Sequence, residues 1–194
     1  MPITARGSAR SRLLEAASRL FYAHGITATG IDRVTAEAGV AKMSLYNNFA
    51  SKEELVAAYV QERHEEWLAL YRARCEGRTS PRERVLAVVD AYLDHARCAY
   101  EHGFRGCGLL NAAAELPAGA PARDRVREHK EQVEQILREQ LAEAECVDPA
   151  ATAEHVSFLL EGAMTRAGLE GTDHRLRTAR AMVEQLLTTG KNAT

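Results

Sequence analysis

Side chains able to bind the edges of DNA bases gather in one short stretch, Lys42-Met43-Ser44-Leu45-Tyr46-Asn47. Lysine can bind a guanine edge or a phosphate, asparagine can bind adenine, and a methionine side chain can contact a thymine methyl group. If the stretch is helical, Leu45 and Phe49 lie close together and Asn47 lies nearly opposite, because each residue turns a helix by about 100°. Leu45 and Phe49 would then anchor the helix, leaving its other face free to meet DNA.

The preceding residues predict the element that supports this helix. After Thr29, a suitable N-cap, apolar residues recur at helical spacing until Gly39 ends the pattern: Ile31, Val34 and Ala38. Two short helices joined by a glycine-containing turn form a helix-turn-helix unit, whose second helix enters the major groove. Ser51 and Glu54 then have the spacing of a capping box, so a long helix is expected to begin at Ser51.

Side chains beside the exposed face are of types that bind phosphate. Tyr46 can donate its hydroxyl, and Thr29 and Lys52 stand at the starts of neighbouring helices. We therefore predict DNA contacts from seven residues: Thr29, Lys42, Met43, Ser44, Tyr46, Asn47 and Lys52. A solvated helix in an ordinary bundle could carry the same side chains and is the alternative.

The distribution of charge favours the DNA interpretation. The whole chain has a formal net charge of −2, but residues 1–52 hold seven Lys and Arg against three Asp and Glu. Residues 53–194 hold 18 basic and 24 acidic residues. A basic N-terminal part and an acidic remainder are expected when only the first part meets phosphate. We therefore predict a DNA-binding domain at residues 1–52.

The remainder of the chain shows helical apolar spacing and no convincing strand pattern. Further helices are expected to start near residues 81, 109, 122, 149 and 176. The predicted fold is all-α with about nine helices, namely a three-helix N-terminal head at 1–52 and a helical domain at 53–194. There is no apolar run of membrane-spanning length and no signal-peptide pattern, so we expect a cytoplasmic protein with no membrane partner.

The run from Thr29 to Lys52 carries three groups of residues at fixed distances: Ala38-Gly39-Val40, Leu45-Tyr46 with Phe49, and Ser51-Lys52-Glu53. In these residues the chain resembles TetR/AcrR-type transcriptional regulators, over roughly residues 8–56. Ala41 and Asn48 depart from the Ser and His that the family often has. The resemblance implies an all-α homodimer with a small-molecule effector site in its C-terminal domain and a dimer interface made by its last two helices. It also implies that the seven residues named above match positions that commonly touch DNA.

Candidate effector-binding residues lie in the C-terminal part. Residues 104–115 look like a run found in one subgroup of these regulators, which assigns no ligand. Asn111 and Glu115 lie four residues apart, so they share a helical face and could line a pocket with nearby aromatic residues. The predicted lining is Trp67, Tyr71, Tyr92, Phe104, Cys107, Asn111, Glu115 and Phe158. Plain core packing is the alternative for each aromatic residue.

Other chemistries are less favoured. Cys107, beside Arg105 in a glycine-rich loop, is the best candidate for a reactive thiol, with Cys98 as its partner, so a thiol-based redox regulator is an alternative function. His95, His102, His129 and His155 lack the close spacing of a zinc site, and we expect no metal and no cofactor. No nucleophile-base motif or phosphate loop is present, so we assign no catalytic residue, and an all-α enzyme is the remaining alternative.

These observations predict a dimeric, sequence-specific transcriptional repressor that responds to a small molecule. Two copies of the helix at residues 41–48 would occupy successive major grooves of a palindromic operator in double-stranded DNA. Effector binding would shift their separation through the helix that begins at Ser51, and the operator would be released. An activator built from the same parts and a pure interaction module are alternatives.

Overall fold

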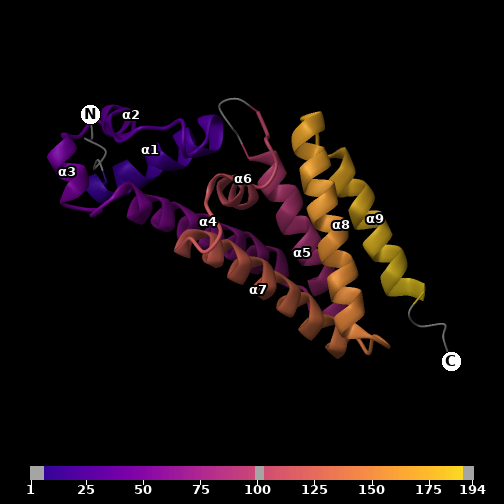
Figure 1. The fold of residues 1–194 in the computed structure, drawn as a ribbon. Helices are drawn as coiled ribbons and strands as arrows, with labels where there is room; N and C mark the ends of the chain where they lie inside the picture. The colour runs from indigo at the N-terminus through magenta and orange to yellow at the C-terminus, as the bar shows by residue number, and fades with distance from the viewer. Residues whose placement is uncertain (1–6, 99–102, 190–194) are drawn as a thin grey trace, which may run out of the picture. The chain divides into compact units, whose positions relative to one another are not determined.

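The computed structural model describes residues 7–98 and 103–189. Within these residues the chain forms nine helices and no strand, which confirms the predicted all-α fold (Figure 1). The helices are α1 (Ala9–His24), α2 (Ile31–Ala38), α3 (Lys42–Tyr46), α4 (Lys52–Cys75), α5 (Pro81–Arg97), α6 (Gly108–Glu115), α7 (Pro121–Glu143), α8 (Pro149–Glu170) and α9 (His174–Thr189). None of the helices within the described ranges is both long and apolar enough to cross a membrane.

The described residues divide into two compact units. The first unit comprises residues 7–63 and 108–126, and the second comprises residues 64–98, 103–107 and 127–189. The helices α4 and α7 each contribute residues to both units. The first unit therefore contains the predicted head together with the start of α4, all of α6 and the start of α7.

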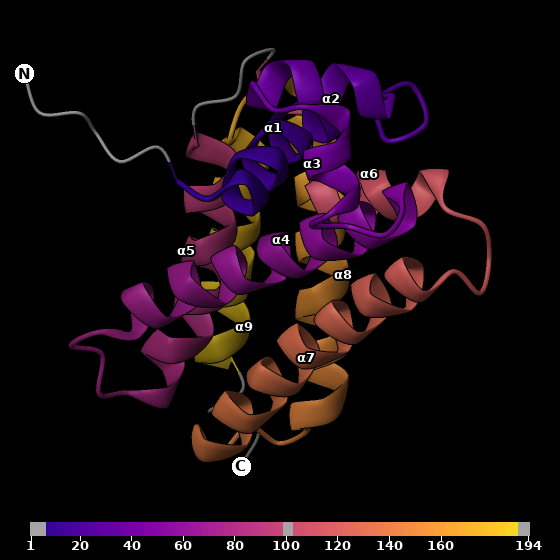
Figure 2. The ribbon, with the colours of Figure 1, turned by 90° about the vertical axis from the view of Figure 1, so that its left-hand side faces the viewer.

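In the first unit, α1 packs against α2, α3 and α6. Apolar residues at three- and four-residue spacing place one face of α1 in the core, where Leu13 and Ala17 are fully buried. The Ser8 hydroxyl caps this helix by accepting the backbone N–H of Ser11 at 3.1 Å. The three helices of the head lie together in both views (Figures 1 and 2).

The turn between α2 and α3 is built as predicted, but the start of α2 is not. Gly39 ends α2 in the left-handed region, at φ +62°, where a side chain would be strained. The N-cap of α2 is Gly30 and not Thr29, so the predicted cap is wrong. The Thr29 side chain is fully buried instead, and its hydroxyl donates to the Gly25 carbonyl at 2.7 Å.

In the second unit, α5, α8 and α9 pack against one another, and α8 and α9 lie side by side in both views (Figures 1 and 2). The start signals in the sequence are confirmed here. The Ser80 backbone N–H donates to the Glu83 carboxylate at 3.2 Å ahead of α5. The Asp148 carboxylate accepts the Ala151 N–H at 3.0 Å ahead of α8.

A buried carboxylate ties α9 to α5 in the second unit. Asp90 on α5 accepts hydrogen bonds from Arg78 and from Arg180 on α9, each at 2.7 Å. Burial raises the pKa of Asp90, but the hydrogen bonds and charges of Arg180 and Arg78 outweigh burial and hold its pKa below the usual value. Both arginines would be left without their shared anion if Asp90 were removed.

We therefore expect Asp90→Ala to lower the free energy of unfolding by about 3–5 kcal/mol, as when one partner of a buried ion pair is deleted. Urea unfolding at neutral pH measures the change. Glu154→Gln, on the exposed surface of α8, should change stability little. An equal effect of the two substitutions would show that the Asp90 ion pairs do not stabilise the unit.

The same ion pairs predict a pH dependence. Because the pKa of Asp90 is lower in the folded protein, its ionised form contributes stability above the unfolded pKa of about 3.9, and this is lost as the pH falls through the folded value. Below about pH 4, the free energy of unfolding of the wild type should fall more steeply with pH than that of Asp90→Asn.

Candidate nucleic-acid interface

The helix α3 is held by two buried side chains and exposes the rest. Leu45 is 0% exposed and Phe49 1% exposed, which confirms their predicted anchoring role. The guanidinium of Arg10 on α1 lies 4.9 Å from the centre of the Phe49 ring. On the outer side, Met43 is 69% and Tyr46 46% exposed. The arrangement presents a short helix face that a DNA groove could accept.

Lys42, at the start of α3, is held to α2 by an ion pair. Its Nζ lies 2.7 Å from the Asp32 carboxylate, and both side chains are exposed. The hydrogen bond from Lys42 to Asp32 and the Asp32 charge raise the pKa of Lys42 above its usual value, so the ammonium stays protonated. A base contact by Lys42 requires this surface pair to open, and such pairs contribute little stability.

The other predicted DNA residues differ in accessibility. Asn47 is exposed at the C-terminal end of α3, and Ser44 and Lys52 are half-buried. The backbone carbonyl of Ser44 accepts the side-chain amide of Asn48 at 2.7 Å, which extends the support of α3 beyond its last residue. The Thr29 side chain has no exposed surface, so it is not available to a phosphate in this structure.

Arginines of α1 fix the approach of α2. Arg12 Nη1 donates to the carbonyls of Ala38 and Gly39, at 3.4 Å each, where α2 ends. Arg19 forms an ion pair with Glu37 of α2 at 2.6 Å. In the sequence, these arginines contributed only to the positive charge of residues 1–52, so their contacts between α1 and α2 were not predicted.

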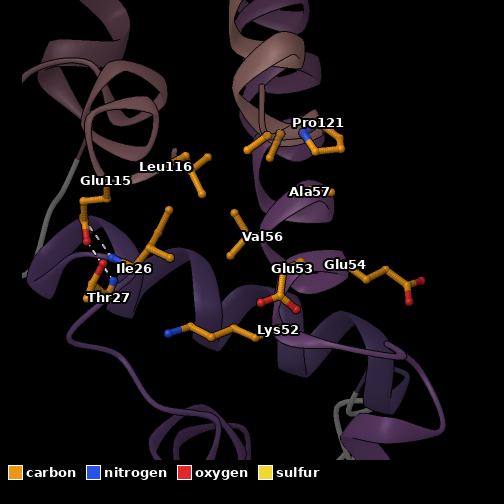
Figure 3. A pocket seen from close by; sticks show the side chains of 12 residues that line it. Ile26, Thr27, Lys52, Glu53, Glu54, Val56, Ala57, Glu115, Leu116 and Pro121 are labelled. Atoms are coloured by element: carbon orange, nitrogen blue, oxygen red, sulfur yellow. Dashed lines mark hydrogen bonds between the residues drawn. The ribbon is translucent and has the colours of Figure 1, made fainter. Parts of the chain in front are cut away.

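A carboxylate from α6 closes the loop between α1 and α2. Glu115 accepts the backbone N–H groups of Ile26 at 3.0 Å and Thr27 at 2.7 Å, as the dashed lines in Figure 3 show. Burial raises the pKa of Glu115, but these hydrogen bonds outweigh burial and lower its pKa overall. Gly25 has φ +89°, and a Cβ there would lie 2.7 Å from the Glu115 carboxylate. Glycine is therefore needed for this close approach as well as for the turn.

Several of the predicted effector residues meet in the second unit. Trp67 and Tyr71 stack with ring centres 5.7 Å apart, and Tyr92 meets Trp67 edge-on at 5.7 Å. Trp67 and Tyr92 are buried, with the Trp67 indole also contacting His129 at 5.5 Å between ring centres. Phe104 lies against His95 at 6.5 Å between ring centres.

Charged groups lie beside this aromatic cluster. Lys130 Nζ forms an ion pair with Glu161 at 2.7 Å and lies 3.7 Å from the Sγ of Cys107. Burial lowers the pKa of Lys130, but the negative groups around it outweigh burial and raise it, so Lys130 remains a cation. Burial, then the charge of Lys130, lowers the pKa of His129 to about 3, so His129 is neutral.

Two sequence models of known families match the chain. The family described as "Bacterial regulatory proteins, tetR family" matches residues 13–59, which include α2 and α3, and "Tetracyclin repressor-like, C-terminal domain" matches residues 81–183. The second match alone covers more than half of the chain. The protein belongs to the TetR family of transcriptional regulators. It is therefore a DNA-binding regulator and not an enzyme.

Individual relatives agree with the family assignment. A TetR-family regulator of Streptomyces coelicolor, SCO4454, is 35% identical in its crystal structure, with a TM-score of 0.86 over 95% of this chain and 96% of that one. The transcriptional activator FasR of Mycolicibacterium smegmatis is 35% identical over 54% of this chain and 46% of its own. The transcriptional repressor KstR2 of Mycobacterium tuberculosis is 31% identical over 59% and 55%. The chain thus spans about half the length of these two relatives.

The eight predicted effector residues of this TetR-family protein are divided between the two units. Asn111 and Glu115 belong to the first unit, whereas the aromatic cluster and Cys107 belong to the second. Phe158 is 67% exposed on α8, away from the core.

His102 lies outside the described residues, and within those described no three His, Cys, Asp or Glu side chains gather as metal ligands.

Lys130 and Glu161 were missed as components of the second unit's polar cluster. They lie on α7 and α8, helices rich in exposed charges, so nothing in their spacing separates this half-buried pair from surface pairs. Glu115 was predicted only as a pocket-lining residue, and the backbone hydrogen bonds that it accepts were not predicted. No local signal could connect residues 115 and 26, which are 89 positions apart.

The contact between Glu115 and Gly25 predicts coupled substitutions. Glu115→Ala should lower the free energy of unfolding by about 1 kcal/mol, for hydrogen bonds that are partly exposed. Gly25→Ala should cost about 1–3 kcal/mol through backbone strain, plus a further cost from the clash with Glu115. Chemical denaturation of both single variants and the double variant should show that Glu115→Ala relieves part of the Gly25→Ala cost.

Gly77→Ala supplies the matched control. Gly77 has φ +73°, with no heavy atom within 4 Å of an added Cβ, and it lies in the second unit. The loss of unfolding free energy in Gly77→Ala should therefore add to that in Glu115→Ala when the two substitutions are combined. Additivity of Gly25→Ala with Glu115→Ala as well would contradict the close-approach interpretation.

Proposed function

We propose that this protein is a dimeric, ligand-responsive repressor that occupies a palindromic operator and is released by a small molecule. The observation that carries the DNA-binding part is the construction of α3, anchored by Leu45 and Phe49 and exposing Met43 and Tyr46. We assign base contacts to Lys42, Met43, Ser44 and Asn47, and phosphate contacts to Tyr46 and Lys52. Thr29 acts in this proposal by fixing the start of α2 from its buried position.

Repression rather than activation is proposed from the mode of binding. A dimer whose two α3 helices lie in successive major grooves, about 34 Å apart, covers a promoter by occupancy alone. Activation would need a further contact with the transcription machinery. Among the relatives, KstR2 is a repressor and FasR an activator, so the direction is tested by experiment.

A gel-shift titration with DNA from upstream of the protein's own gene tests operator binding. The full-length protein should bind a palindromic segment in a sequence-preferring and salt-sensitive manner. Transcription from that promoter in vitro should decrease when the protein is added. A dimer that bound all sequences equally, or that raised transcription, would contradict the proposed repressor.

Single substitutions should separate base contacts from phosphate contacts. Lys52→Ala should weaken binding to all sequences alike and lower the slope of log affinity against log salt by about 1, because one phosphate contact is lost. Tyr46→Phe should also weaken all sites alike. Lys42→Ala should in addition change sequence preference, by about 1–3 kcal/mol at one base pair. Unchanged sequence preference in Lys42→Ala would contradict its assignment, as measured by binding to an operator library.

We propose that the dimer forms through α8 and α9. Exposed apolar side chains on these helices would be buried by a second copy, since Phe158 and Leu169 are 67% and 79% exposed on α8 and Met182 is 46% exposed on α9. On α8 the spacing of Phe158, Gly162, Thr165 and Leu169 places one stripe along the helix. Two such helices from each copy would form a four-helix interface.

Phe158→Glu should therefore shift the protein from dimer to monomer at micromolar concentration, because a carboxylate would be buried in the interface without a partner. Size-exclusion chromatography with light scattering measures this change. Val147→Glu provides the matched control, because Val147 is 77% exposed in the connection between α7 and α8. A dimer that persisted in Phe158→Glu would place the interface elsewhere.

We place the effector site of this repressor at the cluster of Trp67, Tyr92, Lys130 and Glu161. The indole N–H of Trp67 and one carboxylate oxygen of Glu161 are buried and have no hydrogen-bond partner among the described residues. A ligand with polar groups at both positions would satisfy them. The helix α4 has residues in both units and carries the signal in this proposal. Operator binding must then weaken effector binding by the same factor by which the effector weakens operator binding.

The burial of Cys107 gives no support to thiol sensing, which needs an accessible thiol.

A further inference from the structure

The first unit contains a pocket of about 500 Å³ that the proposed effector site does not use. Its walls come from the loop after α1, the first turns of α4, the end of α6 and the segment leading into α7 (Figure 3). The lining is mainly apolar, with Ile26, Val56, Leu116, Pro121 and Ala122 among its members. Its volume lies within the range of about 300–1,000 Å³ found for small-molecule sites.

The carboxylates around this pocket already have hydrogen-bond donors. Glu115 accepts the two backbone N–H groups described above. Glu54 accepts the backbone N–H of Ala50 at 2.6 Å, and Figure 3 shows its side chain directed away from the other labelled residues. The hydroxyl of Ser51 hydrogen-bonds to Glu53 and lowers its pKa. None of the three acids therefore requires a cation from a ligand.

Lys52 is the one cation among the residues that line this pocket. Its side chain extends from the start of α4 toward Ile26 and Thr27 (Figure 3). Among the described residues, no ion pair to its ammonium group is present, although the charge of Lys52 acts on both Glu53 and Glu115. Because the three lining carboxylates already have hydrogen-bond donors, the ammonium can pair with an anion from a ligand, and the apolar walls favour one that carries an apolar body.

We propose that this pocket binds an amphipathic organic anion, whose carboxylate pairs with Lys52 and whose apolar body lies against Ile26, Val56 and Leu116. Lys52 is also a proposed phosphate contact, so the anion and the DNA backbone would compete for one ammonium group. This regulatory consequence rests on the proposed DNA-binding function, whereas the binding of the anion does not. The pocket would act within the DNA-binding unit itself, in addition to any effector site in the second unit.

Octanoate is a suitable probe, with octanol and octylammonium as neutral and cationic molecules of the same chain length. Binding to the full-length protein is followed by NMR of methyl-labelled isoleucine, leucine and valine. Octanoate should shift the methyl signals of Ile26, Val56 and Leu116 and bind at least about tenfold more tightly than octanol, since a charge-assisted contact is gained. Octylammonium should bind no better than octanol.

Variants locate the site and its charge. Lys52→Gln should weaken octanoate binding about tenfold and leave octanol binding unchanged. Ala57→Phe should fill the pocket and weaken both ligands, with the folded methyl spectrum otherwise retained. Arg33→Gln, which removes a positive charge from the exposed surface of α2, should change neither affinity. Full octanoate affinity in Lys52→Gln, or methyl shifts confined to the second unit, would overturn the proposal.

Fluorescence anisotropy with labelled operator then tests the competition. Octanoate should displace the wild-type protein from DNA, and the weaker DNA binding of Lys52→Gln should no longer respond to it. Displacement that persists in Lys52→Gln would refute competition for this ammonium. If the wild type bound no operator while octanoate still shifted the pocket methyl groups in a Lys52-dependent manner, the proposed repressor function would fail and the anion site would stand.

Discussion

The burial of Leu45 and Phe49 is the interaction on which the proposed DNA-binding surface depends. The helix α3 has 5 residues, and isolated helices shorter than about 12–15 residues are only marginally stable in water. Its conformation must therefore come from packing, and these two side chains are almost completely buried. Since Leu45 on α3 and Phe49 just after it point into the core, Met43 and Tyr46 are exposed on the outer side. The same packing that folds the helix thus orients the side chains that we propose to meet DNA.

Electrostatic links around this core then fix the neighbours of α3. Arg12 binds carbonyls at the end of α2, and Lys42 joins the start of α3 to Asp32 of α2. The pair of Lys42 and Asp32 lies at the surface, so it contributes little to folding and can exchange its protein partner for a phosphate at low cost. The head can therefore be rigid in its apolar contacts and adaptable in its charged ones. That combination suits a surface that must slide on DNA before it finds a site.

The sequence was sufficient for features that depend on neighbouring residues. The positions of Gly39, Leu45 and Phe49 predicted the turn and the buried side of α3, because helical spacing and left-handed turns are local properties. The prediction from sequence was wrong for Thr29. Its hydroxyl donates to a backbone carbonyl of the preceding loop and does not cap α2. The hydrogen-bond partners of Glu115 and the ion pair between Lys130 and Glu161 could not be predicted either. Both contacts join segments that only tertiary packing brings together.

The contacts of Glu115 and Thr29 both fix the loop between α1 and α2. Its backbone N–H groups at residues 26 and 27 bind Glu115 of α6, while the Gly25 carbonyl binds Thr29. The polar groups of the loop are thus satisfied from two directions, and a side chain at Gly25 would collide with Glu115. A shift at the end of α6 must consequently move this loop or separate the two N–H groups from their carboxylate acceptor, which costs about 1 kcal/mol for hydrogen bonds that are partly exposed. Because the loop leads directly into α2, such a shift reaches the helix-turn-helix through α2, independently of any motion of α4.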